Sequence, residues 1–156
     1  MRDFSSNATA SVDDKGRVSV PHQLRAVLEA EGGGRLHLVP GFRDPRAIEG
    51  FTPRGFEDIC DAIRDMDWAD PDRQKLEWKV IGRASAAVLD DAGRIVLNRE
   101  LRDEIGIGKR ALFVGAGETL QIWEPDAHAA AMAALFGADA ARPAAALMPR
   151  RRRTAE

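Results

Sequence analysis

The stretch VDDKGRVSVPHQLR at residues 12–25 returns as LDDAGRIVLNRELR at residues 89–102. The two stretches align without a gap at an offset of 77 residues, and six of their fourteen positions are identical. Similarity continues in the same order at two further places, where residues 36–39 parallel 112–114 and residues 47–53 parallel 119–125. A chance likeness between two amphipathic segments would not recur in order at three places, so the sequence indicates an internal duplication.

Each copy predicts a strand, a tight turn, a second strand and a helix. Apolar residues at every second position on both sides of the turn favour half-buried strands. In the first copy, residues 14–16 are typical of a hairpin turn, in which Gly16 supplies a positive φ and Asp14 can bond back to the backbone. Pro21 then favours the start of a helix, because the first turn of a helix leaves its amides unpaired. The second copy repeats this pattern, with Asn98 as the expected helix cap.

Two more strands and a helical segment are expected after the turn unit of each copy. Hydrophobic runs bounded by turn residues predict strands at residues 35–39, 47–51, 111–115 and 119–123. Further helices are expected to begin at Pro53, Pro71 and Pro125. From residue 137 the chain is rich in Ala and Pro and then in Arg, which predicts a disordered tail.

Charge and composition limit the class of protein. The chain of 156 residues carries a net charge of −2, and because its last seven residues carry +3, the remainder carries −5. This acidic body excludes a general polyanion binder, so any contact with nucleic acid must come from a local cluster that oligomerisation repeats. The single cysteine, Cys60, allows no internal disulfide, and no apolar run approaches the ~20 residues of a membrane span. We therefore expect a soluble, unexported, cytoplasmic protein.

The two turns share the form Asp-x-x-x-Arg, at residues 13–17 and 90–94, each inside a strand–turn–strand–helix unit. In this they resemble the MraZ family, whose pattern residues 82–85 and 120–123 also match. The resemblance covers about residues 4–135. It implies an α+β fold of the AbrB type, in which two tandem swapped-hairpin β-α-β repeats form a double-split β-barrel core with flanking helices.

The same resemblance implies a division of the chain. The first repeat with its helix would span residues 4–70, and the second repeat with its helices residues 71–135. Residues 136–156 would form the disordered tail, whose Arg run lies outside the family core. That run is either a solvated tail or a sequence-independent contact with DNA. Lys15 of the first turn is replaced by Ala92 in the second, so the two turns are not equivalent.

MraZ proteins are bacterial transcriptional regulators of the division and cell-wall gene cluster. The resemblance therefore implies a sequence-specific DNA-binding regulator, associated with the nucleoid, that represses this cluster including its own promoter. The family assembles into rings and reads short direct repeats. The implied partners are promoter DNA and further copies of the chain, with no membrane, no cofactor, no metal and no small-molecule substrate.

The candidate DNA-binding residues are Lys15, Arg17 and Arg94. The planar fork of Arg matches two acceptors of guanine in the major groove, or clamps a phosphate, and Lys15 would add a phosphate contact. The candidate turn-forming or Arg-orienting residues are Asp13, Asp14, Gly16, Asp90, Asp91 and Gly93. The first Asp of each pair is expected to orient the Arg, and the glycines to permit the turn and leave room for the DNA backbone. One turn alone would favour a hairpin salt bridge without a partner, but two copies together with the resemblance to the MraZ family favour DNA contact.

Two other classes of function compete with this interpretation. The first is an oligomeric ring scaffold that binds a protein partner through acidic helices, with Glu57, Asp58, Asp61, Asp65 and Asp67 as its contacts. The second is an enzyme, which we do not expect, because His22, His37 and His128 are scattered without metal-ligand spacing. Residues 106–111 fit a loose Gly-x-Gly-x-x-Ala motif but follow a helix and precede a strand, the reverse of a dinucleotide site. Cys60 is expected in the core, and Trp68, Trp78 and Trp123 in the core or an interface.

Overall fold

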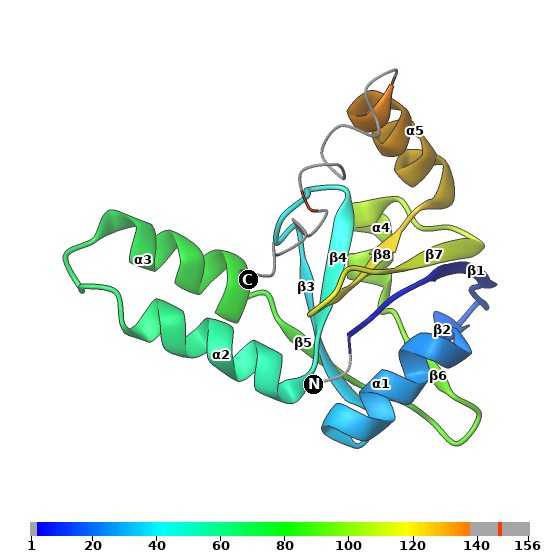
Figure 1. Cartoon of the computed structure of the whole chain (residues 1–156), viewed down its shortest axis with the longest axis horizontal. Helices are drawn as coiled ribbons and strands as arrows, with labels where there is room; N and C mark the ends of the chain where they lie inside the picture. The colour runs from blue at the N-terminus through cyan, green and yellow to red at the C-terminus, as the bar shows by residue number, and fades with distance from the viewer. Residues whose placement is uncertain (1–2, 138–146, 148–156) are drawn as a thin grey trace, which may run out of the picture. The chain divides into compact units, whose positions relative to one another are not determined.

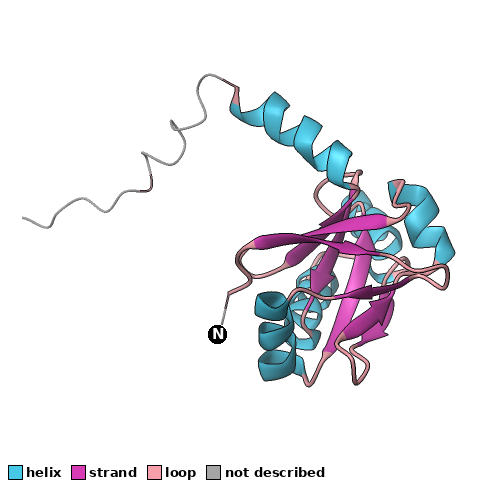
Figure 2. Cartoon of the chain, turned by 90° about the vertical axis from the view of Figure 1, so that its right-hand side faces the viewer, coloured by secondary structure: helices cyan, strands magenta, loops and turns pink. Residues whose placement is uncertain are grey.

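Six strands form an antiparallel sheet and two more form a separate ribbon in the computed structural model, which describes residues 3–137 and residue 147 (Figure 2). Along the sheet lie β1 (Asn7–Ser11), β7 (Arg110–Gly115), β8 (Leu120–Trp123), β4 (Ala47–Phe51), β3 (Arg35–Pro40) and β5 (Ser85–Val88). The ribbon pairs β2 (Arg17–Ser19) with β6 (Arg94–Val96). The α+β class and the strands expected from the sequence are confirmed.

Helices join these strands at the expected places (Figure 1). They are α1 (His22–Gly32), α2 (Pro53–Arg64), α3 (Pro71–Leu76) and α4 (Arg99–Ile105). The hydroxyl of Thr52 accepts a hydrogen bond from the Gly55 amide at 3.0 Å, and the Asn98 side chain accepts one from the Leu101 amide at 2.9 Å. These bonds pair amides that the first turn of a helix would otherwise leave free, which fixes where α2 and α4 begin.

The helix that begins at Pro71 changes from an α-helix to a π-helix after Leu76. We expected a regular helix, but the segment η1 (Glu77–Ile81) is a π-helix, and the Gly82 amide donates to the carbonyl of Glu77 at 2.8 Å. Val80 of this segment packs in a small cluster with Val39, Phe51 and Ile63, between the sheet and the α2–α3 hairpin. The segment therefore anchors the hairpin to the sheet just before β5 begins.

The two halves of the duplicated sequence exchange strands. β1 of the first half pairs with β7 of the second, and β5 of the second half pairs with β3 of the first. The ribbon joins β2 to β6, and β4 pairs with β8, so both of these contacts also cross between the halves. Among the named strands of the described residues, the hairpins β3–β4 and β7–β8 are the pairs that lie within one half. Neither half can complete its own sheet, because each supplies the partners of the other.

The main core lies between the sheet, α1, α4 and the inner face of the ribbon. It gathers twenty buried apolar side chains, among them Leu28 of α1, Leu101 of α4, and Val18 and Ile95 of the ribbon. Cys60 is buried as expected, and burial raises the pKa of its thiol. Trp123 is buried, whereas Trp68 and Trp78 are 82% and 70% exposed and so do not belong to the core of this chain.

Residues from Asp126 onward form a second unit, of which the structure describes α5 (Pro125–Phe136) and little more. Most of the expected tail at residues 136–156 lies outside the described residues. Within the described part of the chain, no helix is long and apolar enough to cross a membrane.

Candidate functional site

The two Asp-x-x-x-Arg turns have the same hydrogen-bond pattern. In the first, the Asp13 carboxylate accepts from the backbone amides of Lys15 at 3.0 Å and Arg17 at 2.8 Å. In the second, Asp90 accepts from the amides two and four residues later at 2.9 and 2.8 Å. The expectation that Asp14 bonds back to the turn was wrong. The first Asp of each pair does so, because it stands two residues before the amide that an Asx-turn requires.

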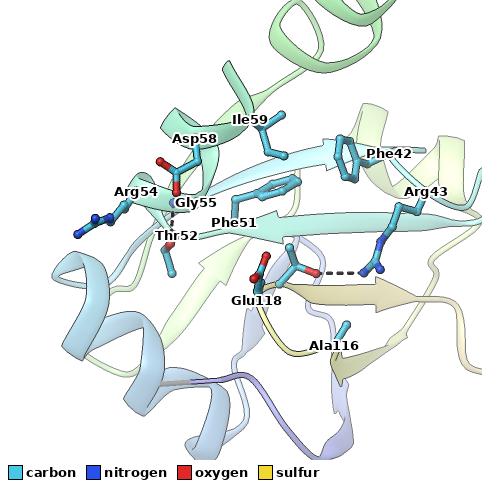
Figure 3. A pocket seen from close by; sticks show the side chains of 11 residues that line it. Phe42, Arg43, Phe51, Thr52, Arg54, Gly55, Asp58, Ile59, Ala116 and Glu118 are labelled. Atoms are coloured by element: carbon cyan, nitrogen blue, oxygen red, sulfur yellow. Dashed lines mark hydrogen bonds between the residues drawn. The ribbon is translucent and has the colours of Figure 1, made fainter. Parts of the chain in front are cut away.

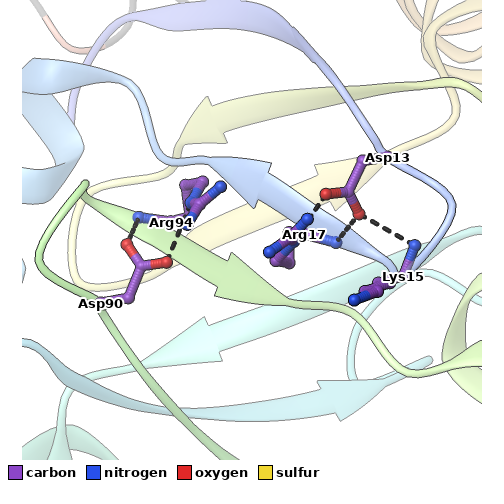
Figure 4. A network of polar contacts seen from close by, with 5 residues as sticks. All are labelled: Asp13, Lys15, Arg17, Asp90 and Arg94. Atoms are coloured by element: carbon purple, nitrogen blue, oxygen red, sulfur yellow. Dashed lines mark hydrogen bonds and ion pairs between the residues drawn. The ribbon is translucent and has the colours of Figure 1, made fainter.

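The same carboxylates hold the arginine side chains. Arg17 donates from Nε to Oδ2 of Asp13 at 2.6 Å, and Arg94 donates from Nε to Oδ2 of Asp90 at 2.9 Å (Figure 4). These four side chains are between 37% and 40% exposed. Among the residues that the structure describes, no polar group bonds the Nη atoms of either arginine. Each guanidinium is therefore fixed at its stem while its terminal fork faces solvent.

These bonds keep both aspartates ionised. The backbone amides of Arg17 and Arg94, together with their guanidinium groups, lower the pKa of Asp13 and Asp90 below the ordinary value of 3.8. A carboxyl whose pKa is lowered by folding stabilises the fold above its ordinary pKa, and loses this effect as the pH falls through the lowered value. The Asp–Arg pairs therefore stay intact throughout the neutral and mildly acidic range.

The ribbon brings the two arginines onto one surface, although 77 residues separate them. Arg17 lies opposite Val96, and Ser19 lies opposite Arg94, with Val18 and Ile95 paired between them. The middle pair faces the core, and each of its side chains is 1% exposed. Since alternate residues of a strand face opposite sides, the outer face is formed by Arg17, Ser19, Arg94 and Val96. Lys15 lies exposed in the turn beside this face (Figure 4), and Ala92 takes the equivalent position in the sequence of the second turn.

The two turn glycines face the rest of the chain. Gly16 has φ +82° and Gly93 has φ +75°, which favours glycine at both positions. A methyl group on Gly16 would clash with the carbonyl oxygen of Leu97, and one on Gly93 would clash with the guanidinium of Arg25. The opposite half of the chain therefore fills the space where a side chain would stand, so packing within the chain requires glycine at both positions.

Comparison with known proteins places this architecture in a family. The family model of the antitoxin-like MraZ protein matches residues 80–150. The transcriptional regulator MraZ of Parvibaculum lavamentivorans is 36% identical over 130 residues, which is 83% of this chain and 81% of that protein. The chain belongs to the MraZ family. MraZ regulators of a Ruegeria species and of Rhodospirillum rubrum are each 34% identical to it, over 81% of this chain and 80% and 83% of their own lengths.

Two further arginines of this MraZ-family chain, Arg25 and Arg102, pack against the glycines of the turns. The sequence alone assigned them no role. Arg102 of α4 donates from Nε to the Leu97 carbonyl at 2.9 Å, and the same nitrogen lies 3.2 Å from the point where a Cβ of Gly16 would stand. The guanidinium of Arg25, on α1, lies where a Cβ of Gly93 would stand. Arg25 and Arg102 occupy the same position in the two aligned stretches. This shared position could have indicated that both arginines make an equivalent contact.

The acidic residues of the scaffold hypothesis lie on and after α2. Glu57 and Asp61 both bond to Arg64 of the same helix, which neutralises part of that acidic face. In residues 3–137 and at residue 147, no group of three or more His, Cys, Asp or Glu is placed to hold a metal ion.

A pocket of about 370 Å³ lies between the start of α2 and the β7–β8 turn, lined among others by Phe42, Phe51 and Arg43 (Figure 3). Arg43 donates to Glu49, which is 1% exposed, at 2.7 Å. Thr119 and Gln121 donate to the same carboxylate at 2.5 and 3.0 Å. These groups satisfy one another across the β4–β8 contact, so the network joins the two halves of the MraZ fold.

Proposed function

We propose that the chain is a sequence-specific DNA-binding transcriptional regulator whose contact surface is the outer face of the β2–β6 ribbon. The observation that carries this proposal is the pairing that puts Arg17 and Arg94 diagonally across one face of the ribbon, each fixed at Nε by an aspartate. A hairpin salt bridge with no further role would not require two copies on one exposed face.

The chemistry of this face suits the major groove. A two-stranded β-ribbon fits into that groove, and the fork of an arginine can bond O6 and N7 of one guanine. The Asp13–Arg17 and Asp90–Arg94 bonds hold the guanidinium groups before DNA arrives, so less side-chain freedom is lost on binding. Lys15 lies at the edge of the ribbon, where it would reach a phosphate and set the register.

The ribbon carries little net charge for a DNA-binding surface, because Asp13, Asp14, Asp90 and Asp91 surround its basic residues. We propose that copies of the chain assemble into a ring, which presents several ribbons to successive direct repeats. Linked contacts raise the overall affinity by about 100-fold or more, since each later contact forms at a high effective concentration. Such a ring would reconcile an acidic body with tight binding at a promoter.

Membership of the MraZ family leads to more detailed proposals about the fold, the location in the cell and the target genes. We propose that residues 4–70 and 71–135 are two AbrB-like repeats that close a double-split β-barrel, and the strand exchange between the halves supports this. We also propose that the protein acts in the cytoplasm at the nucleoid, as a repressor of the division and cell-wall gene cluster and of its own promoter. Membership of the family supports this choice of target.

Binding to promoter DNA tests the proposal. The protein should bind a duplex taken from upstream of its own gene more tightly than a scrambled duplex of equal length and composition. If a ring engages successive direct repeats, a duplex with several repeats should bind about 100-fold more tightly than one with a single repeat, at one salt concentration. Fluorescence anisotropy with labelled duplexes measures both differences.

The two comparisons separate the parts of the proposal. Equal affinity for the upstream and scrambled duplexes would contradict sequence-specific DNA binding and favour the scaffold hypothesis. Equal affinity for one and several repeats would leave DNA binding in place but contradict the role of the ring.

A further inference from the structure

One exposed side chain on the outer face of the ribbon is apolar. Val96 is 55% exposed, although its neighbours on this face are Arg17, Ser19 and Arg94. On the inner face, the apolar Val18 and Ile95 are 1% exposed and belong to the core. The side chain of Val96 is therefore not part of that core. It shares the outer face with the guanidinium groups of Arg17 and Arg94.

The cross-strand register places Val96 next to one arginine in particular. Val96 lies directly opposite Arg17, and Ser19 lies directly opposite Arg94. Side chains opposite each other on one face of an antiparallel pair have Cβ atoms about 5 Å apart. That separation is about one and a half times the 3.4 Å rise between base pairs along DNA, which flexible side chains can span, so such a pair can meet neighbouring base pairs.

The alignment of the two copies shows that this difference breaks the symmetry of the ribbon. At the offset of 77 residues, Ser19 is the counterpart of Val96, and Arg17 is the counterpart of Arg94. The two arginines are thus equivalent, while the side chains beside them are chemically different. A ribbon with two identical ends would read a palindromic step, whereas this one presents two unlike ends.

We propose that Val96 determines part of the base specificity by packing on the C5-methyl group of a thymine adjacent to the guanine that Arg17 bonds. This inference rests on the proposed function. Thymine is the base that presents a methyl group in the major groove, and apolar side chains recognise it by contact. Ser19, with a hydroxyl that donates and accepts, takes the corresponding place beside Arg94. One copy of the chain then reads an asymmetric sequence, which suits direct repeats.

Replacing single thymines by deoxyuridine in the upstream duplex tests this contact, because the exchange removes the methyl group and keeps base pairing. The wild-type protein should lose about fourfold in affinity at one thymine beside a guanine, the equivalent of one buried methyl group. Val96→Ser should bind the unmodified duplex about fourfold more weakly and should not distinguish thymine from deoxyuridine at that position. Fluorescence anisotropy at one salt concentration measures each value.

Two further variants sharpen the test. Val88→Ser changes a valine of similar exposure, 59%, on β5 instead of the ribbon, and it should keep the wild-type response to deoxyuridine. Ser19→Val should acquire a second sensitive thymine, near the guanine that Arg94 bonds. Both sites are exposed, so circular dichroism should show folded proteins.

The outcomes distinguish this inference from the proposed function. If the wild-type protein binds the upstream duplex specifically but no deoxyuridine weakens binding, the role of Val96 is overturned and the proposed function stands. The same holds if Val96→Ser keeps the wild-type sensitivity. If the wild-type protein does not prefer the upstream duplex at all, the proposed function fails, and this inference fails with it.

Discussion

Replacing both Arg17 and Arg94 with alanine is expected to weaken binding to the upstream duplex by about 100-fold or more at one salt concentration. A bidentate contact between arginine and guanine contributes about 1–3 kcal/mol of discrimination, and two contacts of about 1.4 kcal/mol each already correspond to this factor. The fold should survive, because both Asp–Arg pairs lie at the surface, where ion pairs contribute little to stability. Anisotropy titrations give the affinity, and circular dichroism shows whether the double variant is folded.

The charge of the arginines and the geometry of their forks can be separated. Arg17→Lys keeps the charge but loses the fork, so it should lose most of the sequence preference and retain attraction to phosphate. Arg46→Ala is a matched control, since Arg46 is also half-exposed and bonds through Nε to a nearby aspartate, Asp44, but lies outside the ribbon. It should bind like the wild-type protein. Wild-type affinity in the Arg17→Ala, Arg94→Ala double variant would remove these residues from the DNA interface.

Gly16→Ala is expected to destabilise the protein by about 4 kcal/mol. An L-residue in the left-handed region costs about 1–2 kcal/mol, and forcing a methyl group against packed atoms costs about 1–3 kcal/mol more. The atom it would meet is the Leu97 carbonyl oxygen, in the backbone segment whose amide donates to the Gly16 carbonyl at 2.8 Å. Losing that hydrogen bond costs about 1 kcal/mol. Urea unfolding followed by circular dichroism measures the difference.

Gly117 provides the control for backbone strain. It has the same φ of +82°, but a Cβ there would meet no atom within 4 Å. Gly117→Ala should therefore cost only the conformational part, about 1–2 kcal/mol. Gly93→Ala should fall between the two, because the atoms it meets belong to the side chain of Arg25, which can move. If Gly16→Ala and Gly117→Ala lowered the free energy of unfolding equally, Gly16 would not be packed against Leu97 of the opposite half of the chain.

Much of the fold could be predicted from the sequence, because the duplication repeats local signals. The glycine of each turn, the caps Thr52 and Asn98 and the alternating apolar positions mark elements that depend on neighbours close in the chain. The exchange of strands was different. A segment as short as β2 has no periodicity that selects its partner, and its pairing with β6 depends on the core that both halves build together. The resemblance to a family implied that exchange, whereas the residue pattern alone did not.

The candidate site could be predicted only in part for a similar reason. Asp-x-x-x-Arg spacing shows which side chains can meet within one turn, and the Asp13–Arg17 contact follows from it. The contacts of Gly16 with Leu97 and Arg102 join residues more than 80 positions apart. No local pattern reports such a contact, so the packing of this glycine against the opposite half of the chain could not be predicted. The exposure of Val96 likewise becomes visible only once the register of the ribbon is known.

Hydrogen–deuterium exchange with and without the upstream duplex tests the central claim most directly, because it locates the bound DNA on the protein. DNA on the outer face of the ribbon should slow exchange in peptides that cover residues 13–19 and 90–96. Peptides that cover α2, which carries Glu57, Asp58 and Asp61, and peptides that cover α3 should exchange at the same rate in both states. Unchanged exchange in the ribbon peptides, with slower exchange in α2 and α3, would contradict the assignment of the ribbon as the DNA-binding surface.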